Sequence, residues 1–176
     1  MGWAEEVLAD LPVGWWPCNE GTGAPLDESG NGFDTTLSAG AGTWTTDAPL
    51  GDVLAVGDGV WTTTAEVPGG GCTITFAAKL TYVSDLGDVR VAGDDGAGSY
   101  LSGRVWSSDS GATSDIDGAA ENLAPAAADV NSTNNPVVDE WAHYAITASG
   151  TTITLYVNGT SVDTATLGTA TTADLP

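Results

Sequence analysis

Short runs of β-branched and aromatic residues recur along the whole chain, and Gly, Asp, Asn or Pro interrupts each run. Residues of the first kind pack well on a pleated sheet, whereas those of the second kind favour turns. The clearest example is Asn158-Gly159, which separates the runs Thr152–Val157 and Thr160–Thr166 and suits a two-residue type I′ hairpin. Spacing typical of a helix is nearly absent after Leu11. About ten short strands at regular intervals predict one antiparallel sandwich.

The remaining strands are predicted from the same alternation. They cover residues 13–18, 35–37, 54–56, 60–64, 73–80, 89–92, 100–106 and 141–148. Residues 119–136 are rich in Ala and Asn and poor in β-branched residues, so we expect a long surface loop there, with one helical turn at most. A short helix is predicted over Trp3–Ala9, and the turn at residues 10–12 ends it.

The charge of the chain restricts its partners. Of 176 residues, 24 are acidic and 3 are basic, so the net charge is −21. Nucleic acid and anionic membranes would repel such a surface, and neither is an expected partner. Disorder is excluded as well, because 41% of the residues are hydrophobic and 7 are Trp. We expect most acidic side chains to be solvated, hydrogen-bonded to loop amides or neutralised by cations, and a high-salt habitat would favour the same composition.

The length fits one domain, which we place at residues 11–176 after a helical arm at residues 1–10. The N-terminus lacks the basic and apolar regions of a secretory signal, and no apolar run reaches the ~18–20 residues that span a membrane. Cys18 and Cys72 are the two cysteines, and no Cys-x-x-Cys or Cys/His cluster points to zinc. Two buried free thiols and a disulfide both stay open, because bridging depends on the separation of the Cα atoms.

Three segments carry more than a general β pattern. The first reads Val-Gly-Trp-Trp-Pro-Cys-Asn-Glu-Gly-Thr-Gly at residues 13–23 and continues as Leu-Asp-Glu-Ser-Gly-Asn-Gly at residues 26–32. The second is Trp-Ala-His-Tyr-Ala-Ile-Thr at residues 141–147, and the third is Ile-Thr-Leu-Tyr-Val-Asn-Gly at residues 153–159. In this order they resemble the laminin-G-like, concanavalin A-type jelly-roll family, whose members often contain the strings YWPLDEGSG, DSSGNG, W-x-H-V-A and LYVNG.

The resemblance covers residues 11–167 and implies an all-β fold, an antiparallel two-sheet jelly-roll sandwich of the concanavalin A-like kind with a short N-terminal helix. Residues 7–23 also resemble the start of such domains in structural proteins of tailed phages. A virion protein leaves the cell by lysis and needs no signal peptide. The expected function is a non-enzymatic virion surface protein, a capsid decoration or tail component that docks on the particle and contacts host-surface glycans. Its expected partners are other virion proteins and further copies of itself.

Two rival functions stay open, a calcium-assisted carbohydrate-binding or adhesion module of a cellular secreted system and a glycan-cleaving enzyme. Hydrolysis of a glycosidic bond needs two carboxylates about 5–9.5 Å apart. Glucanases of this fold place them on one strand as Glu-x-Asp-x-(x)-Glu. Asp115 and Asp117 alternate in this way but lack the Glu partner, so an enzyme is not expected. His143, the single histidine, is expected to lie packed in a sheet strand.

Members of the family usually continue past the LYVNG hairpin with an Ile-Gly-Gly strand and a closing Gly-x-Ile-Asp-Glu-Val-x-Ile-Tyr strand. The sequence ends at Pro176 before either of them. We therefore expect an exposed sheet edge in the middle of the sandwich. The chain would be truncated, or residues 47–67 would cover the gap, or a neighbouring subunit would supply a strand by β-augmentation.

Calcium is the candidate cofactor. Asp27, Asn31 and Asp34 crowd one Gly-containing loop together with Glu28, and calcium takes about 6–8 oxygen ligands from side chains and carbonyls. Related jelly rolls bind calcium near this loop, so the resemblance points the same way. The alternative is a loop whose Asp and Asn side chains hydrogen-bond their own amides.

The candidate ligand-binding residues are Trp44, Trp61 and Trp106, which lie outside the three segments that carry the resemblance. An exposed Trp ring can stack on a sugar or anchor a subunit contact. Burial in the sandwich is the alternative role for each of them.

Overall fold

A computed structural model of the chain describes residues 3–48, 50–55, 59–65, 71–79, 88–94, 100–107, 114–121, 128–132 and 139–166. Side chains are described in these segments except for Trp3 and the strands between residues 88 and 132. The chain divides into two compact units, Met1–Glu66 and Val67–Pro176. The expected single domain at residues 11–176 stays a prediction.

The first unit begins with α1 (Trp3–Ala9), the helix that the sequence predicts. Glu5 and Glu6 lie in its first turn, where the positive end of the helix dipole favours acidic side chains. The helix ends where Leu11 takes a left-handed backbone conformation with a φ of 52° and Pro12 follows. No helix in the described part of the chain is long and apolar enough to cross a membrane.

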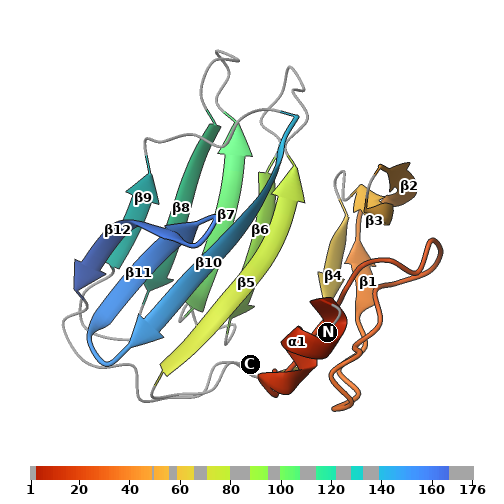
Figure 1. Ribbon diagram of the computed structural model, residues 1–176, viewed down its shortest axis with the longest axis horizontal. Helices are drawn as coiled ribbons and strands as arrows, with labels where there is room; N and C mark the ends of the chain where they lie inside the picture. Colours follow the sequence, from red (N-terminus) through yellow and green to blue (C-terminus); the bar gives the residue numbers. More distant parts are fainter. Residues whose placement is uncertain are drawn as a thin grey trace. The chain divides into compact units, whose positions relative to one another are not determined.

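Two antiparallel strand pairs follow in this unit (Figure 1). They are β1 (Thr36–Ala39) with β4 (Val60–Thr62), and β2 (Thr43–Asp47) with β3 (Gly51–Ala55). The sequence predicts β1, β3 and β4 approximately. It misses β2, because Trp44 is the one large apolar residue in that strand and no alternation marks it.

Residues 13–18 are predicted to be a strand, and this prediction is wrong. The Trp15 N–H donates to Asp27 Oδ1 at 3.0 Å, and the Trp15 carbonyl accepts from the Glu28 N–H at 2.8 Å. Cys18 has a left-handed φ of 53°, a conformation that interrupts an extended run. The segment is therefore bonded to the neighbouring loop and not to a sheet.

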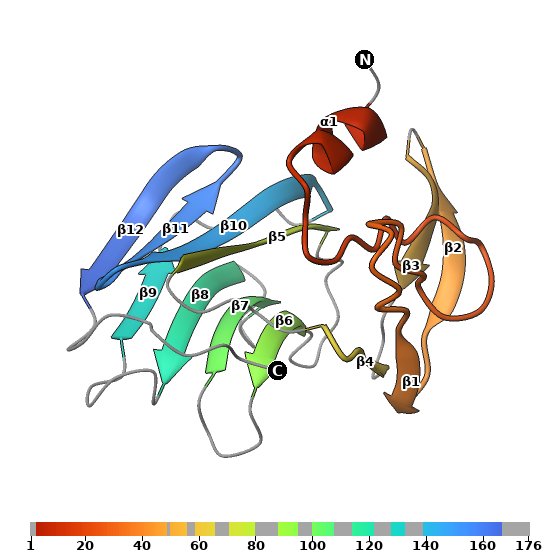
Figure 2. The same cartoon turned by 90° about the horizontal axis from the view of Figure 1, so that it is seen from below.

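The second unit contains two four-stranded antiparallel sheets that face each other (Figure 1 and Figure 2). One sheet has the order β12–β11–β10–β5 and the other has the order β6–β7–β8–β9. The strands are β5 (Gly71–Lys79), β6 (Asp88–Asp94), β7 (Tyr100–Ser107), β8 (Ser114–Glu121), β9 (Ala128–Ser132), β10 (Trp141–Ser149), β11 (Thr152–Val157) and β12 (Thr160–Thr166). The antiparallel two-sheet jelly-roll sandwich with a short N-terminal helix is confirmed.

The stretch 119–136, predicted to be a surface loop, contributes to two strands. It contains the end of β8, up to Glu121, and the whole of β9, which pairs with β8. Backbone N–H and C=O groups form a ladder whatever the side chains are, so the low content of β-branched residues did not prevent it. The loop prediction is wrong for these strands, and residues 122–127 and 133–136 lie outside the described part.

The described core of the second unit lies on the inner face of β10 and β11. Four large side chains there are at most 1% exposed: Tyr144, Ile146, Ile153 and Leu155. The ring of Phe76 on β5 lies 5.3 Å from that of Tyr144 in a tilted contact of the kind aromatic pairs prefer. Burial raises the pKa of Tyr144 to about 12, so its hydroxyl stays neutral. Burying each such side chain stabilises the fold by roughly 1.5–3 kcal/mol.

The predicted hairpin between β11 and β12 is confirmed. Asn158 and Gly159 have φ values of 49° and 77°, the left-handed pair that a type I′ turn requires. Asn158 also bonds this turn to β10, because its N–H donates to the His143 carbonyl at 2.8 Å and its Oδ1 accepts from the His143 N–H at 2.9 Å. His143 thus lies in a sheet strand, as the sequence predicts.

Candidate binding surfaces

Asp27 organises the long loop of the first unit. Its Oδ1 accepts hydrogen bonds from the N–H groups of Trp15 (3.0 Å) and Ser29 (2.9 Å). Its Oδ2 accepts from the Ser29 hydroxyl (2.8 Å) and the Phe33 N–H (2.9 Å). These four donors use the four lone-pair sites of the carboxylate.

The pKa of Asp27 reflects this arrangement. Burial by itself would raise it, but the N–H groups of Trp15 and Phe33 and the two donors of Ser29 favour the ionised form and lower the pKa to about 2. The carboxylate is therefore ionised at neutral pH, where it fixes three segments of the loop around one point.

Asn31 and Asp34 lie in the same loop but bond to other groups. Asn31 Nδ2 donates to the Val13 carbonyl at 2.9 Å, and Asp34 Oδ1 accepts from the Asp27 N–H at 2.9 Å. In the described part of the chain, no three or more His, Cys, Asp or Glu side chains are grouped so that they could hold a metal ion. The Asp27 carboxylate has no lone pair left for a cation, so the loop fits self-bonding better than calcium binding. Calcium at Asp27, Asn31 and Asp34 stays a prediction.

Trp44 and Trp61 each make a structural contact in the first unit. Trp44 Nε1 donates to the Gly23 carbonyl at 3.0 Å, and the Trp61 ring lies against Gly42, where a Cβ atom would collide with it. Both Trp side chains are half-buried. Trp106 lies on β7, and its side chain is outside the described ones. A ligand-binding role of these three residues stays a prediction.

The sequence did not single out the outer face of the β12–β11–β10–β5 sheet, formed by the side chains that alternate with the buried ones. Two rows of opposed residues cross all four strands, and most of them bear hydroxyl groups. The first row is Thr73, Thr147, Thr154 and Thr164, and the second is Gly71, Ser149, Thr152 and Thr166. Neighbouring strands lie about 4.7–4.9 Å apart, so these hydroxyls form a regular array.

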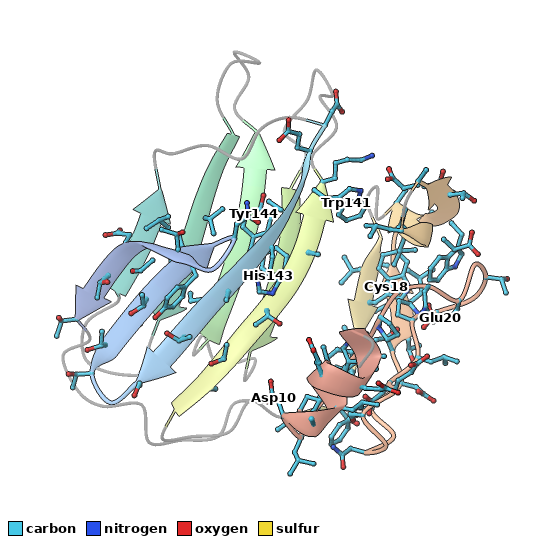
Figure 3. All side chains as sticks on the ribbon, viewed as in Figure 1. Asp10, Cys18, Glu20, Trp141, His143 and Tyr144 are labelled. Atoms are coloured by element: carbon cyan, nitrogen blue, oxygen red, sulfur yellow. The ribbon has the colours of Figure 1, made fainter. Side chains whose placement is uncertain are left out.

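The outer face carries no acidic residue among its described positions. Besides the two rows, it comprises Thr75, Ala77, Lys79, Trp141, His143, Ala145, Tyr156 and Ser161. Lys79 Nζ lies 5.7 Å from the centre of the Trp141 ring, a cation–π contact. Trp141 and His143 lie along β10 (Figure 3). On a chain with a net charge of −21, this face is lined by hydroxyl groups, has no acidic residue at its described positions and carries Lys79 at its edge.

Cys18 and Cys72 are both free and half-buried. Burial, and secondarily the charge of Glu20, raises the pKa of Cys18 to about 11, and burial also raises the pKa of Cys72. Glu20 itself accepts from the Leu26 N–H at 2.8 Å through Oε1. Both thiols are protonated at neutral pH, which makes them poor nucleophiles and poor metal ligands.

The comparisons with known proteins identify the family. The family model of the concanavalin A-like lectin/glucanases superfamily, of the laminin G type, matches residues 54–175. This range is more than half of the chain, which therefore belongs to that superfamily. No curated protein and no solved structure matches it.

The match includes two of the three segments that carry the resemblance. The segments at residues 141–147 and 153–159 lie within it, on β10 and on β11 with its turn, and Asn158 joins them through its bonds to His143. The first segment, at residues 13–32, lies outside the match and forms the Asp27 loop. The shared family features thus belong mainly to the second unit.

Proposed function

We propose that this protein is a non-enzymatic virion surface protein, a capsid decoration or tail component, whose lectin-like domain contacts neutral glycans of the host surface. The outer face of the β12–β11–β10–β5 sheet is the observation that carries the glycan part. Its Thr and Ser hydroxyls both donate and accept hydrogen bonds, as the hydroxyls of a sugar do. Membership of a superfamily that contains lectins supports the same ligand class.

Neutral glycans are preferred because of the charge of the protein. With 24 acidic and 3 basic residues, the chain repels sialylated and other acidic glycans. The outer face has no acidic residue at its described positions, so a neutral sugar reaches its hydroxyls without that repulsion. We therefore expect neutral glycans to bind more tightly than acidic ones, with a difference that shrinks as salt screens the charges.

The chemistry of the same face favours binding over hydrolysis. Glycoside hydrolysis needs two carboxylates about 5–9.5 Å apart. The described positions of the outer face present hydroxyls, Lys79 and His143 and no pair of carboxylates. The superfamily includes glucanases as well as lectins, so an assay of sugar release from β-glucans tests this point. We expect no release above the buffer control.

The first unit supports the docking part of the proposal. Seven of its large apolar side chains are 38–85% exposed: Leu8, Leu11, Val13, Leu26, Leu37, Leu50 and Val60. Apolar surface suits docking on a particle, since surface charge would keep acidic subunits apart. Other virion proteins and further copies of the chain are the proposed partners, and the virion surface is the proposed location. Immunogold labelling of purified particles should place the protein there, and unlabelled particles would contradict this.

A glycan array tests the contact with sugars. Thr154→Glu places a carboxylate in the middle of the outer face and should weaken binding by about tenfold or more. Thr45→Glu adds the same charge at an exposed position of β2 and should leave binding unchanged. Equal loss in the two variants, or no neutral glycan bound by the unaltered chain, would contradict the proposed site.

The alternative is a calcium-assisted carbohydrate-binding or adhesion module of a cellular secreted system. Its candidate calcium site is the loop of Asp27, Asn31 and Asp34, in which the Asp27 carboxylate already accepts four hydrogen bonds. The array is repeated with a chelator and then with added calcium. Binding that is lost and restored supports the alternative, whereas binding that persists supports a metal-free site.

A further inference from the structure

The sequence contains two Asn-Gly pairs, Asn31-Gly32 in the first unit and Asn158-Gly159 in the second. Asparagine that precedes glycine is prone to deamidation, because glycine has no Cβ atom to hinder the attack of its own nitrogen on the asparagine side chain. All four residues are exposed to solvent. The two pairs therefore agree in local sequence and in exposure, and they differ in how the fold holds them.

Deamidation requires the chain to move at the asparagine. The glycine nitrogen loses its proton and bonds to Cγ of the asparagine, the bond from Cγ to Nδ2 breaks, and Nδ2 leaves as ammonia, which carries that proton away. Water then opens the five-membered ring at one of its two carbonyl groups, which gives aspartate or isoaspartate. Water is the only co-reactant, and nothing is oxidised or reduced. Because ring closure changes the backbone dihedral ψ of the asparagine, the flanking residues have to adjust.

Asn158 is held on both sides by paired strands. The strands β11 and β12 meet at the Val157↔Thr160 pair, on either side of the turn. Asn158 and Gly159 have the left-handed φ values of 49° and 77° that this turn needs. The Asn158 N–H donates to the His143 carbonyl at 2.8 Å, and Asn158 Oδ1 accepts from the His143 N–H at 2.9 Å. Ring closure at Asn158 would have to break the bond of its side chain and distort a turn between two paired strands.

Asn31 is held less firmly. It lies between Gly30 and Gly32, whose φ values are 91° and 78°, and glycine accepts a change of backbone dihedrals more easily than other residues. No strand of the described structure includes residues 30–32. Asn31 Nδ2 donates to the Val13 carbonyl at 2.9 Å, whereas the other two hydrogen bonds of Asn31 are 3.3 and 3.4 Å long and therefore weak. Ring closure at Asn31 has one hydrogen bond of ordinary length to break.

We propose that Asn31 is a site of spontaneous deamidation in the folded protein, and that the β11–β12 hairpin protects Asn158. The difference between the two pairs comes from the fold, since glycine follows both asparagines. The site is independent of glycan binding and of the proposed location on a virion. It adds a slow covalent change to a loop that the Asp27 carboxylate otherwise holds in one arrangement.

The reaction removes a hydrogen-bond donor from this loop. The carboxylate oxygen that takes the place of Asn31 Nδ2 accepts hydrogen bonds but donates none, so it faces the Val13 carbonyl as a second acceptor. The bond that joins residue 31 to residue 13 is therefore lost. Isoaspartate also inserts an extra carbon atom into the backbone between Gly30 and Gly32. Each event adds one negative charge to a chain that already carries −21.

Incubation of the full chain at mildly alkaline pH, followed by peptide mapping with mass spectrometry, tests the proposal. The map distinguishes asparagine, aspartate and isoaspartate at each position, and a sample digested without incubation is the control. We expect Asn31 to react about tenfold faster than Asn158 or more, because more hydrogen bonds have to open at Asn158. In the chain unfolded by denaturant, the two asparagines should react at similar rates.

A variant tests the consequence for the loop. Asn31→Asp reproduces the aspartate product and should speed up hydrogen exchange at the Trp15 N–H by about fivefold, the effect of one lost hydrogen bond. Asn19→Asp makes the same charge change at another exposed asparagine of the first unit and should leave this exchange unaltered.

Four results would overturn the proposal. They are equal rates at Asn31 and Asn158 in the folded chain, a faster reaction at Asn158, a ratio of rates that unfolding does not change, and an Asn31 that stays unmodified when the folded chain is incubated. Equal effects of Asn31→Asp and Asn19→Asp on hydrogen exchange would overturn the loss of the bond to Val13.

Discussion

The hydrophobic side chains that form the core of the second unit are 0–9% exposed, whereas seven large apolar side chains of the first unit are 38–85% exposed. The first unit is organised instead by polar contacts around Asp27, which bonds to Trp15, Ser29 and Phe33. One chain thus uses burial of apolar surface in one unit and hydrogen bonding to a charge in the other.

The difference shows how the two units can serve separate tasks. Apolar burial along β10 and β11 is non-directional and scales with area, so it supports a rigid sheet whose outer face can vary. Hydrogen bonds to one carboxylate fix a loop with few residues but leave apolar side chains uncovered. This contrast supports the two parts of the proposed function, docking through the first unit and glycan contact on the outer sheet face of the second.

The largest effect on stability is expected when a core side chain of the second unit is removed. Leu155→Ala, at a position that is 1% exposed, should destabilise the second unit by about 2–5 kcal/mol through lost burial and a cavity. Leu37→Ala, at a position in the first unit that is 45% exposed, should change stability by less than about 0.5 kcal/mol. Denaturant unfolding followed by circular dichroism measures both. Similar losses of stability in the two variants would contradict the difference between the two units.

The polar organisation of the first unit is tested at Asp27. Asp27→Ala removes the acceptor of four hydrogen bonds and should destabilise the loop by about 1–2 kcal/mol, discounted for its partial exposure to water. Hydrogen exchange should speed up at Trp15, Ser29 and Phe33, while β10 stays protected. Glu28→Ala, a change at the exposed neighbouring carboxylate, should leave exchange unaltered.

The pH dependence of the same carboxylate sharpens this test. Its pKa of about 2 in the folded chain lies below the ordinary value near 3.9 for an unfolded Asp. The stability that it contributes is therefore present above about pH 4 and is lost as the pH falls through 2. NMR titration of the Asp27 carboxyl carbon should give a midpoint near 2. A midpoint near 4 would show that the four hydrogen bonds do not form in solution.

A smaller effect is expected at the turn between β11 and β12. Asn158→Ala removes the acceptor of the His143 N–H and a residue that tolerates the left-handed conformation, and should cost about 1 kcal/mol. Asn131→Ala is the control variant, because it removes the same type of side chain from β9, outside this turn. Thermal unfolding measures the change. A larger loss than in Leu155→Ala would mean that the turn, and not the core, dominates the second unit.

The smallest effect is expected at the edge of the outer face. A double-mutant cycle of Lys79→Met and Trp141→Leu should give a coupling of about 0.5 kcal/mol, the usual size of an exposed cation–π contact. Denaturant unfolding of the four chains supplies the numbers. A coupling near zero would show that this contact does not stabilise the second unit.

The strands were predictable where alternation and turn residues coincide. The observed bounds of β11 and β12 agree with the predicted ones, because the Asn158-Gly159 turn fixes where β11 ends and where β12 begins. Residues 13–18 have the aromatic content of a strand, but their backbone bonds to the side chain of Asp27, which lies beyond a turn. β9 has a single β-branched residue, Val130, and pairs with β8 along its length.

The candidate sites were predictable only in part. The sequence identified Asp27 as unusual from its crowding with Asn31 and Asp34, but it left open whether cations or amides would meet the carboxylate. It did not identify the outer face, because one of its four strands comes from a distant part of the chain: Thr73 of β5 lies opposite Thr147 of β10. No short turn joins these two strands, so no local spacing in the sequence encodes their register, unlike that of the β11–β12 hairpin.

The sequence by itself determined the β composition, the helix Trp3–Ala9, the Asn158-Gly159 hairpin and the charge of −21. Each of these depends on residue type or on neighbours a few positions away. The tertiary structure alone decided that Thr73 lies opposite Thr147, that β5 takes an outer position and that the Asp27 carboxylate faces amides. The physical reason is that strand order and register arise from pairing over long chain separations, where backbone groups of any sequence can bond and only the whole fold selects the partners.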